Sequence, residues 1–313
     1  MQARERKFDV TVVGELNLDL ILYGLPGEMQ PEREHLADGL SLTLGSSSAI
    51  FAHNLATLGS RVGFVSRVGE DPLGRISLER LSAAEVDVSK VRVVPGKTST
   101  GLTVILTHPG NRHILTYPGT MFEMCMDDLD VDYLASAGHF HLSSYFLHRG
   151  LAAQIPGLFH RMKELGLTTS LDTNDDPSDR WESGIWETLR YVDVFLPNER
   201  EALRITGCED LRDALDGLAS VVPVVVVKLG PQGALARRGS EEVTRPPVKV
   251  DFVDPVGAGD SFDAGFIHRY VRGADLAACL ELGNLAGAFS TTRPGGTEAF
   301  RERHHFDSFF SRP

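Results

Sequence analysis

Short apolar runs rich in Val, Ile and Phe alternate with longer amphipathic stretches along the whole chain. Each run is typical of a buried strand, and the stretches between them have helical periodicity, as at 151–165 and 198–206. Strands that alternate with helices favour a mainly parallel central sheet with helices on both faces. We therefore predict an α/β fold in a single domain, residues 1–313, with strands at 8–14, 62–68, 140–142, 168–172, 192–196 and 222–229.

Two segments break this alternation. Segment 18–44 is interrupted by prolines and a glycine before an alternating run at 39–44, and segment 98–118 has the pattern of a β-hairpin. The turn of this hairpin, Pro109-Gly110-Asn111, supplies the backbone dihedrals that a chain reversal needs. We expect the two segments to pair into a small β-sheet lid over the carboxyl edge of the main sheet, where ligands bind in open α/β folds.

The charge and hydropathy of the chain argue against several classes of protein. A formal net charge of −12 disfavours a nucleic-acid partner, because phosphate backbones are bound by basic surfaces. No apolar run approaches the roughly 18 residues of a membrane helix, so we expect no membrane partner. Three widely separated cysteines without a CxxC spacing are typical of the reducing cytoplasm, which is the location we predict.

The most informative segment is Val253-Asp-Pro-Val-Gly-Ala-Gly-Asp-Ser-Phe. Gly257 and Gly259 allow a tight turn and a close approach to a ligand. The apolar residues that follow at every fourth position predict a helix that starts near Gly257. A glycine turn that opens a helix is an anion site, because unpaired N–H groups and the positive end of the helix dipole face outward. Asp260 lies in the first turn of this helix.

Two interpretations of Asp260 follow from these residues. A carboxylate in the first turn stabilises a helix through its dipole. The two glycines, however, cost helix stability and are not needed for that role. Phosphoryl transfer explains the whole arrangement, because the N–H groups of the turn would stabilise the transferred group while Asp260 accepts the proton of the attacking hydroxyl. The candidate catalytic residues are therefore Asp260, Gly257, Ala258 and Gly259.

The segment Asp254-Pro-Val-Gly-Ala-Gly-Asp-Ser-Phe resembles the C-terminal signature of the ribokinase-like carbohydrate kinases, the PfkB family. The resemblance extends in order over nearly the whole chain, through Gly14-Glu-Leu-Asn-Leu-Asp19, Gly45-Ser-Ser-Ser-Ala with Leu58-Gly59, Val68-Gly-Glu-Asp-Pro-Leu-Gly74, Asp172-Thr-Asn174, Asn198-Glu-Arg-Glu201 and Lys228-Leu-Gly-Pro-Gln-Gly233. One short motif is a weak signal, whereas seven in the expected order are a strong one. The resemblance implies a ribokinase-like fold and an ATP-dependent kinase that phosphorylates a hydroxyl of a small sugar or sugar-like substrate.

The resemblance also implies roles for individual residues. Those that match the substrate motifs are Asn17, Asp19, Gly45, Ser46 and Ser47. Those that match the ATP site are Asn198, Lys228, Gly230, Gly233 and Asn284. Glu201 would hold Mg²⁺ through water, and Asp254 matches the K⁺ ligand of potassium-dependent members.

For some of these residues a structural interpretation stays open. Asn198 and Glu201 have the spacing of a helix capping box. Asn284 lies in a predicted helix, where packing would explain it. Many family members have Thr at the position of Lys228, whose side chain either reaches a phosphate or points into solvent.

The sequence departs from the family pattern at the substrate motif. Family sugar kinases usually have Asn where this chain has Ile50, which removes a partner for sugar hydroxyls. A partly apolar substrate is therefore one alternative to a sugar. An adenosine-like nucleoside kinase on the same fold is another. Phe51, Phe122 and Tyr145 are candidates for stacking on a nucleobase. The sequence does not identify the substrate.

The predicted lid strands carry apolar residues on both faces, because Val104 and Leu106 alternate with Ile105. A two-sided, exposed sheet is prone to associate with another chain. Ribokinase-like relatives often pack two lids together. We therefore expect a homodimer through the lid, with Ile105 in the contact.

Overall fold

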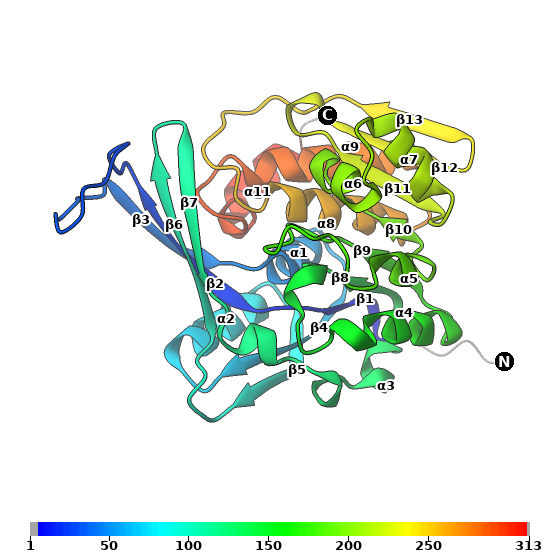
Figure 1. Cartoon of the computed structure of the whole chain (residues 1–313), viewed down its shortest axis with the longest axis horizontal. Coiled ribbons are helices and arrows are strands. Elements are labelled where there is room, and N and C mark those ends of the chain that lie inside the picture. Colours follow the sequence, from blue (N-terminus) through cyan, green and yellow to red (C-terminus); the bar gives the residue numbers. More distant parts are fainter. Residues whose placement is uncertain (1–5, 312–313) are drawn as a thin grey trace.

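The computed structural model, which describes residues 6–311, has one large sheet that contains the six predicted strands and three strands that were not predicted. They are β1 (Phe8–Val13), β4 (Val62–Gly69), β5 (Asp87–Val94), β8 (Ala137–Leu142), β9 (Thr168–Leu171), β10 (Val194–Phe195), β11 (Val224–Lys228), β12 (Ala234–Arg238) and β13 (Glu241–Arg245). Within the described residues the order is β13-β12-β11-β10-β9-β8-β1-β4-β5, and neighbours are parallel except where β12 pairs with β11 and β13. The predicted α/β fold is confirmed (Figure 1).

Hydrophobic cores lie on both faces of the large sheet. In β11, Val225 and Val227 belong to one core, and Val224 and Val226 belong to the other. The helices on the first face are α4 (Ile155–Glu164), α5 (Ile185–Leu189), α6 (Glu199–Thr206) and α7 (Leu211–Ala219). Those on the second are α1 (Ser47–Thr57), α2 (Pro72–Ala83), α8 (Ala258–Tyr270) and α9 (Leu276–Ser290). Burial on both faces explains why the strands are almost wholly apolar.

Three shorter helices complete the described chain: α3 (Val131–Leu134), α10 (Glu298–Arg301) and α11 (Arg303–Phe310). The aromatic rings of α10 and α11 pack around Phe289 of α9 and form a satellite of the main cores. No helix within residues 6–311 has the length and apolar character needed to cross a bilayer.

Close packing against α9 fixes the position of α8. A Cβ atom at Gly265 of α8 would lie 2.5 Å from the carbonyl oxygen of Leu282, and one at Gly283 of α9 would lie 2.9 Å from the ring of Phe262. Glycine is needed at both positions, because a side chain would push the helices apart. The first turn of α8 is thereby held beside the carboxyl ends of the central strands.

The second sheet has four strands among the described residues: β2 (Asn17–Tyr23), β3 (Gly39–Leu44), β6 (Gly101–His108) and β7 (Asn111–Tyr117). Their order is β3-β2-β6-β7, and β6 and β7 form the predicted hairpin. Figure 1 shows this sheet projecting as an arm at the left of the large sheet. We call it the lid sheet.

The inner face of the lid sheet packs on the body of the molecule. Ile21 and Ile105 from this face form a buried cluster with Val256, which lies next to the glycine turn of α8. The expectation that Ile105 lies in an exposed contact is therefore wrong. Strand alternation gives the reason, because Ile105 faces the body while Val104 and Leu106 face away.

The outer face of the lid sheet is apolar across all four strands. Residues that pair directly across neighbouring strands share a face, and two such rows are Leu42-Leu20-Val104-Leu115 and Leu40-Leu22-Leu106. Leu40 is 67% exposed and Leu115 is 55% exposed. The outer face therefore carries exposed apolar residues, and on the inner face Ile114, the cross-strand partner of Ile105, is also 56% exposed.

Candidate active site

The predicted glycine turn is present at the start of α8. Gly257 immediately precedes the helix and has a φ of 72°, in the left-handed region that favours glycine. A Cβ atom at this position would lie 2.5 Å from the Cα atom of Gly296, so the turn is also closely packed. Ala258 and Gly259 open the helix. The N–H groups of a first helical turn lack acceptors within the helix, so this turn can bind an anion.

Asp260 lies in that first turn and is 8% exposed. Burial, followed by the charge of Asp172, raises the pKa of Asp260 to about 7, against the opposing effects of Lys228 and a hydrogen bond with Ser47. A carboxylate whose pKa is close to neutrality is suited to accept a proton from a hydroxyl group. Asp260 and the glycine turn therefore place a group that can accept a proton beside N–H donors that can bind an anion.

Asp19, on β2 of the lid sheet, faces the same space. A Cβ atom at Gly45 would lie 2.1 Å from Oδ1 of Asp19, so glycine at position 45 allows the carboxylate to lie against the backbone before α1. Burial, followed by the charge of Asp260, raises the pKa of Asp19 to about 7. This coupling shows that the lid sheet brings its carboxylate close to the one on α8.

Asn17 presents a buried polar atom to the region around Asp19. Its Nδ2 atom donates a hydrogen bond of 3.2 Å to Oγ1 of Thr103 on β6. Its Oδ1 atom is buried and has no hydrogen-bond partner in the described chain. Because an unpaired buried acceptor is costly, a hydroxyl group bound beside Asn17 would stabilise this arrangement.

The three serines that start α1 have different roles. Ser46 is the N-cap residue, and its hydroxyl accepts from the N–H of Ala49 and donates to the carbonyl oxygen of Glu15. Ser48 is fully buried. Ser47 lies between them and is the serine that interacts with Asp260. Of the predicted pair Ser46 and Ser47, only Ser47 is brought against the carboxylate of Asp260.

Glu15 is a buried residue of this region that the sequence did not single out. Its carboxylate accepts hydrogen bonds of 2.7 Å from the hydroxyls of Ser48 and Ser144. A Cβ atom at Gly14 would lie 1.8 Å from Oγ of Ser48, so α1 can approach β1 only because residue 14 is glycine. The motif Gly14-Glu-Leu-Asn-Leu-Asp19 contained both residues, and the glycine-acid pair was the available signal.

Lys228 ends β11 and forms a buried ion cluster with two aspartates. Its Nζ atom lies 2.9 Å from Oδ2 of Asp263, on α8, and 3.3 Å from Oδ2 of Asp172, which follows β9. Burial alone would lower the pKa of Lys228, but the charges of Asp172, Asp263 and Glu201 raise it. The side chain therefore points into the protein beneath the glycine turn, and a Cβ atom at Gly259 would lie 3.6 Å from Nζ.

Asn198 and Glu201 form the capping box of α6. Asn198 Oδ1 accepts from the N–H of Glu201, while the N–H and Nδ2 of Asn198 donate to Glu201 at 2.8 Å and 2.6 Å. The structural interpretation of this motif is confirmed. Burial, followed by the charge of Asp172, raises the pKa of Glu201 to about 7, against the effect of Lys228. The capping carboxylate thus belongs to the same charge cluster as Lys228.

A cleft of about 580 Å³ lies between the segment after β13 and α9, and the loop after β11 packs against Arg245, one of the residues that line it. Gly230 and Gly233 have φ values of 55° and 93°, and a Cβ atom at Gly233 would lie 2.1 Å from the carbonyl oxygen of Arg245. Asn284 lines the cleft, and its Nδ2 atom donates to the carbonyl oxygens of Arg245 and Pro246. Asn284 therefore holds one wall of the cleft in place.

Asp254 already accepts three hydrogen bonds at the predicted cation site. Oδ1 accepts from the N–H of Val256, and Oδ2 accepts from the N–H of Gly295 and from the hydroxyl of Tyr23 on the lid sheet, at 2.8 Å. The carboxylate and nearby carbonyls are the oxygen ligands that a K⁺ ion takes, but direct binding at Oδ2 would compete with Tyr23. A hydrogen bond thus joins the lid sheet to this loop.

Ile50 and two of the three aromatic residues considered for base stacking lie in the core. Ile50 is 3% exposed and packs against the glycine turn, with Cδ1 2.6 Å from a Cβ atom built at Gly296. Phe51 stacks on His141, and Tyr145 is 2% exposed. Phe122 lies under the guanidinium of Arg149. Phe51 and Tyr145 are therefore not free to stack on a base.

Comparison with known proteins places the chain among sugar and nucleoside kinases. A family model described as pfkB family carbohydrate kinase matches residues 7–303. An uncharacterized sugar kinase of Archaeoglobus fulgidus is 31% identical over 245 residues, which cover 78% of this chain and 96% of that protein. A cytidine kinase of Thermococcus kodakarensis is 31% identical over 284 residues, 88% of this chain and 93% of that protein. The solved structure of a putative ribokinase II from E. coli, in complex with ATP and Mg²⁺, has a TM-score of 0.86 and 24% identity, and the match covers 98% of this chain and 100% of that one.

Proposed function

Since this chain belongs to the pfkB family of carbohydrate kinases, we propose that it transfers the γ-phosphate of ATP to a hydroxyl of a small sugar, with Asp260 as general base. The observation that carries the proposal is the position of Asp260 in the first turn of α8, directly after the glycine turn and in contact with Ser47. This arrangement places a proton acceptor beside a group of N–H donors. Phosphoryl transfer to a hydroxyl needs both at one point.

The reaction uses the ionised form of Asp260. Its carboxylate accepts the proton of the substrate hydroxyl as the oxygen attacks the γ-phosphorus in line, and ADP leaves. The N–H groups of Gly257 to Gly259 stabilise charge on the transferred phosphoryl group. Asp19 and the unpaired Oδ1 of Asn17 accept hydrogen bonds from other substrate hydroxyls and orient the reacting one.

The residues near the predicted Mg²⁺ site fit that ion. Mg²⁺ keeps most of its water and needs few protein ligands, and Glu201 with Asn198 supplies a carboxylate and an amide. When bound, Mg²⁺ would neutralise charge on the ATP phosphates, with Glu201 holding it through water. The E. coli relative solved with ATP and Mg²⁺ supports this part of the proposal. ATP would lie along Gly230, Gly233 and the cleft that Asn284 lines.

A nucleoside kinase is the second candidate, favoured by the cytidine kinase relative at 31% identity. The burial of Phe51 and Tyr145 supports a sugar, since neither ring is available for a base. A coupled ADP-release assay with a panel of sugars and nucleosides separates the two. We expect the highest kcat/KM with a sugar. A higher kcat/KM with a nucleoside would favour the nucleoside kinase instead. Absence of ADP release with every compound would reject both functions.

We also propose that the enzyme is a homodimer through the outer face of the lid sheet. The rows that contain Leu40 and Leu115 form an apolar surface on an arm, and such surfaces are usually covered. Two sheets can pack face to face, so the same surface of a second copy could cover this one. Dimerisation would then hold the inner face, with Asp19, against the site.

A further inference from the structure

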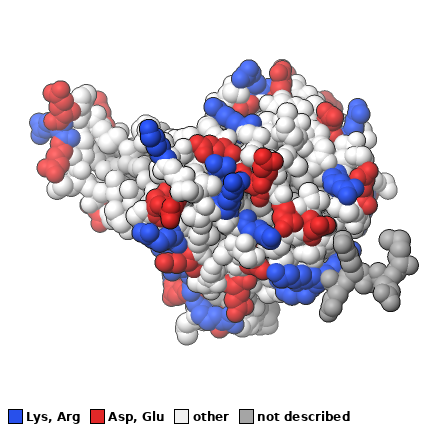
Figure 2. Space-filling model, turned by 90° about the horizontal axis from the view of Figure 1, so that it is seen from below, with Lys and Arg blue, Asp and Glu red and all other residues white. Residues whose placement is uncertain are grey.

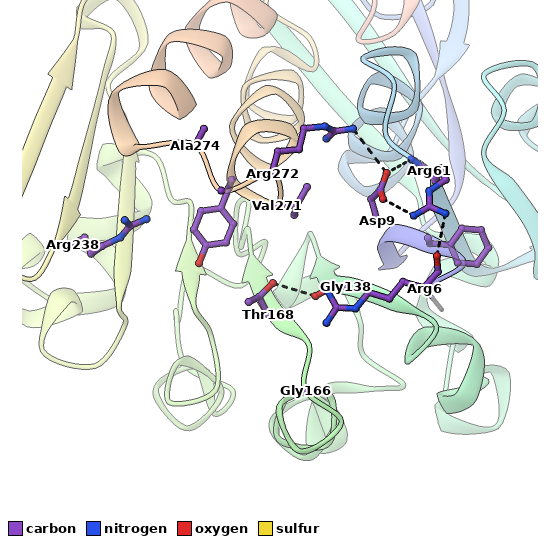
Figure 3. Close-up of a pocket in the computed structure, with 13 residues that line it drawn as sticks. Arg6, Asp9, Arg61, Gly138, Gly166, Thr168, Arg238, Val271, Arg272 and Ala274 are labelled. Atoms are coloured by element: carbon purple, nitrogen blue, oxygen red, sulfur yellow. Dashed lines mark hydrogen bonds and ion pairs between the residues drawn. The ribbon is translucent and has the colours of Figure 1, made fainter. Parts of the chain in front are cut away.

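A second cavity, of about 520 Å³, lies at the amino-terminal edge of the large sheet. It is lined by residues before and within β1, by the first residues of β8 and β9, by the end of β12 and by the turn after α8. The catalytic turn lies at the opposite end of α8. This cavity is therefore separate from the candidate active site, and we call it the edge cavity (Figure 3).

The edge cavity has a strong excess of positive charge. Its charged lining residues are Arg6, Arg61, Arg238, Arg272 and a single carboxylate, Asp9. The chain as a whole has a formal net charge of −12. Four guanidinium groups around one cavity are thus a local feature that the composition does not explain, and their mutual repulsion would be relieved by an anion.

The fold explains two of the four arginines. Arg61 pairs with Oδ1 of Asp9 at 2.9 Å and donates to the carbonyl oxygen of Arg6. Arg272 donates to the carbonyl oxygen of His268 near the end of α8 and lies 3.9 Å from Oδ2 of Asp9. These contacts cap a helix and join it to β1. Both side chains are held in place, and they share the one negative charge of the cavity.

The contacts of the fold do not explain the other two arginines, Arg6 and Arg238. Both are exposed, and neither forms an ion pair with a carboxylate of residues 6–311. A Cβ atom at Gly138 would lie 2.7 Å from Nη1 of Arg6, so the glycine allows this side chain to lie across the start of β8. Holding an uncompensated guanidinium over a cavity brings no gain in stability, which points to a ligand.

The two unpaired arginines are well separated. Figure 3 shows Arg238 on one side of the cavity and Arg6, with Arg61 and Asp9, on the other. In the sheet order, β11, β10, β9 and β8 lie between the strand that ends at Arg238 and the strand that Arg6 precedes. The lining between them includes Gly138, Gly166 and Thr168, together with apolar side chains such as Val271 and Ala274. The cavity is therefore elongated, with a cation at each end.

We propose that the edge cavity binds a small organic molecule with two anionic groups, such as a sugar bisphosphate or a phosphorylated acid. One anionic group pairs with Arg6, near Arg61 and Arg272, and the other pairs with Arg238. Guanidinium groups suit this role because they bind phosphate and carboxylate oxygens with two parallel hydrogen bonds. The ligand also contacts the turn after α8, the helix whose first turn carries Asp260.

Isothermal titration calorimetry on the full chain tests this proposal. Mg²⁺ and a non-hydrolysable ATP analogue are present in excess, so that the nucleotide part of the proposed active site is occupied. The anionic probes are fructose 1,6-bisphosphate and 3-phosphoglycerate, which distinguish a bisphosphate from a phosphorylated acid. Fructose is the uncharged comparison. The variant is Arg6→Gln with Arg238→Gln. The control is Arg190→Gln, which removes an exposed arginine that has no ion pair among residues 6–311 and lies outside the cavity.

We expect the wild-type chain and Arg190→Gln to bind one equivalent of at least one anionic probe, with a Kd below about 1 mM. Any binding of fructose to the proposed sugar site should be the same in the wild-type chain and the double variant. The double variant should bind about tenfold more weakly or not at all, with an unchanged melting temperature in the absence of probe, because both side chains are exposed. A smaller loss of affinity, or no binding of either probe to the wild-type chain, would overturn the proposal. If the double variant does not fold, the two single variants are judged by the same criterion.

Discussion

The Nζ atom of Lys228 lies 2.9 Å from Oδ2 of Asp263, so β11 and α8 are joined by a buried ion pair beneath the glycine turn. Asp172 lies 3.3 Å from the same nitrogen. The cluster thus contains one cation and the carboxylates of Asp172, Asp263 and Glu201. Within residues 6–311 the cation that balances them is Lys228. Its removal should affect both the stability of the protein and the pKa of Asp260.

Lys228→Met should lower the free energy of unfolding by about 3–5 kcal/mol, because it leaves buried carboxylates without their cation. Urea denaturation measures this loss. The control is Lys90→Met, which removes an exposed ion pair with Asp130 and should cost about 1 kcal/mol or less. Equal losses for the two variants would show that the Lys228 cluster has no special role in stability.

The value of kcat/KM should rise with pH and level off above about pH 7, because Asp260 must be ionised to accept a proton and its pKa is raised to about 7. Below that pKa the rate should fall about tenfold for each pH unit. Since Lys228 lowers the pKa of Asp260, Lys228→Met should move the midpoint to higher pH. A profile that is flat between about pH 5.5 and about pH 8.5 would argue against a titrating base.

Local sequence patterns predicted the elements that short-range physics determines. The capping box of Asn198 and Glu201 and the hairpin turn at Pro109-Gly110-Asn111 depend on residues within a few positions of one another. The glycine turn before Asp260 was predictable for the same reason, since position 257 has the left-handed backbone that favours glycine.

Contacts between distant segments could not be predicted in the same way. Lys228 lies beside Asp172 and Asp263 only because β9, β11 and α8 meet at one edge of the sheet. The alternation of β6 showed that Ile105 and Val104 lie on opposite faces, but not which face meets the body. That choice depends on Val256, which lies far along the chain and packs against Ile105. The seven ordered motifs supplied the family, and the family supplied the remaining site residues.

Tyr23→Phe should strengthen any activation by K⁺. The Tyr23 hydroxyl donates to Oδ2 of Asp254, and the substitution frees that oxygen for a cation. Burial, followed by the charge of Asp254, raises the pKa of Tyr23, so the hydroxyl stays protonated and remains a donor at neutral pH. The measurement is kcat/KM over a range of KCl concentrations, with NaCl added to keep the ionic strength constant. An unchanged response to KCl would contradict the prediction that Asp254 is a K⁺ ligand.

Leu115→Glu should shift the protein from dimer to monomer, because it places a charge on the outer face of the lid sheet, where Leu115 is 55% exposed. Light scattering gives the mass. Trp186→Glu is the control, since Trp186 on α5 is 39% exposed and lies away from the lid sheet. If the wild-type chain is already a fully active monomer at micromolar concentration, the lid dimer is rejected.

The rate of Asp260→Asn tests the account most directly. The pKa of Asp260 is raised above its ordinary value of 3.8, so the folded state disfavours the ionised form, and loss of the charge above pH 7 should not reduce stability. ATP affinity and melting temperature should therefore stay close to those of the wild-type chain and of the exposed control Asp213→Asn. At pH 8, kcat should fall by about 10²–10⁴-fold in Asp260→Asn and remain unchanged in the control. A variant that keeps more than about a tenth of the wild-type kcat would contradict the assignment of Asp260 as the base.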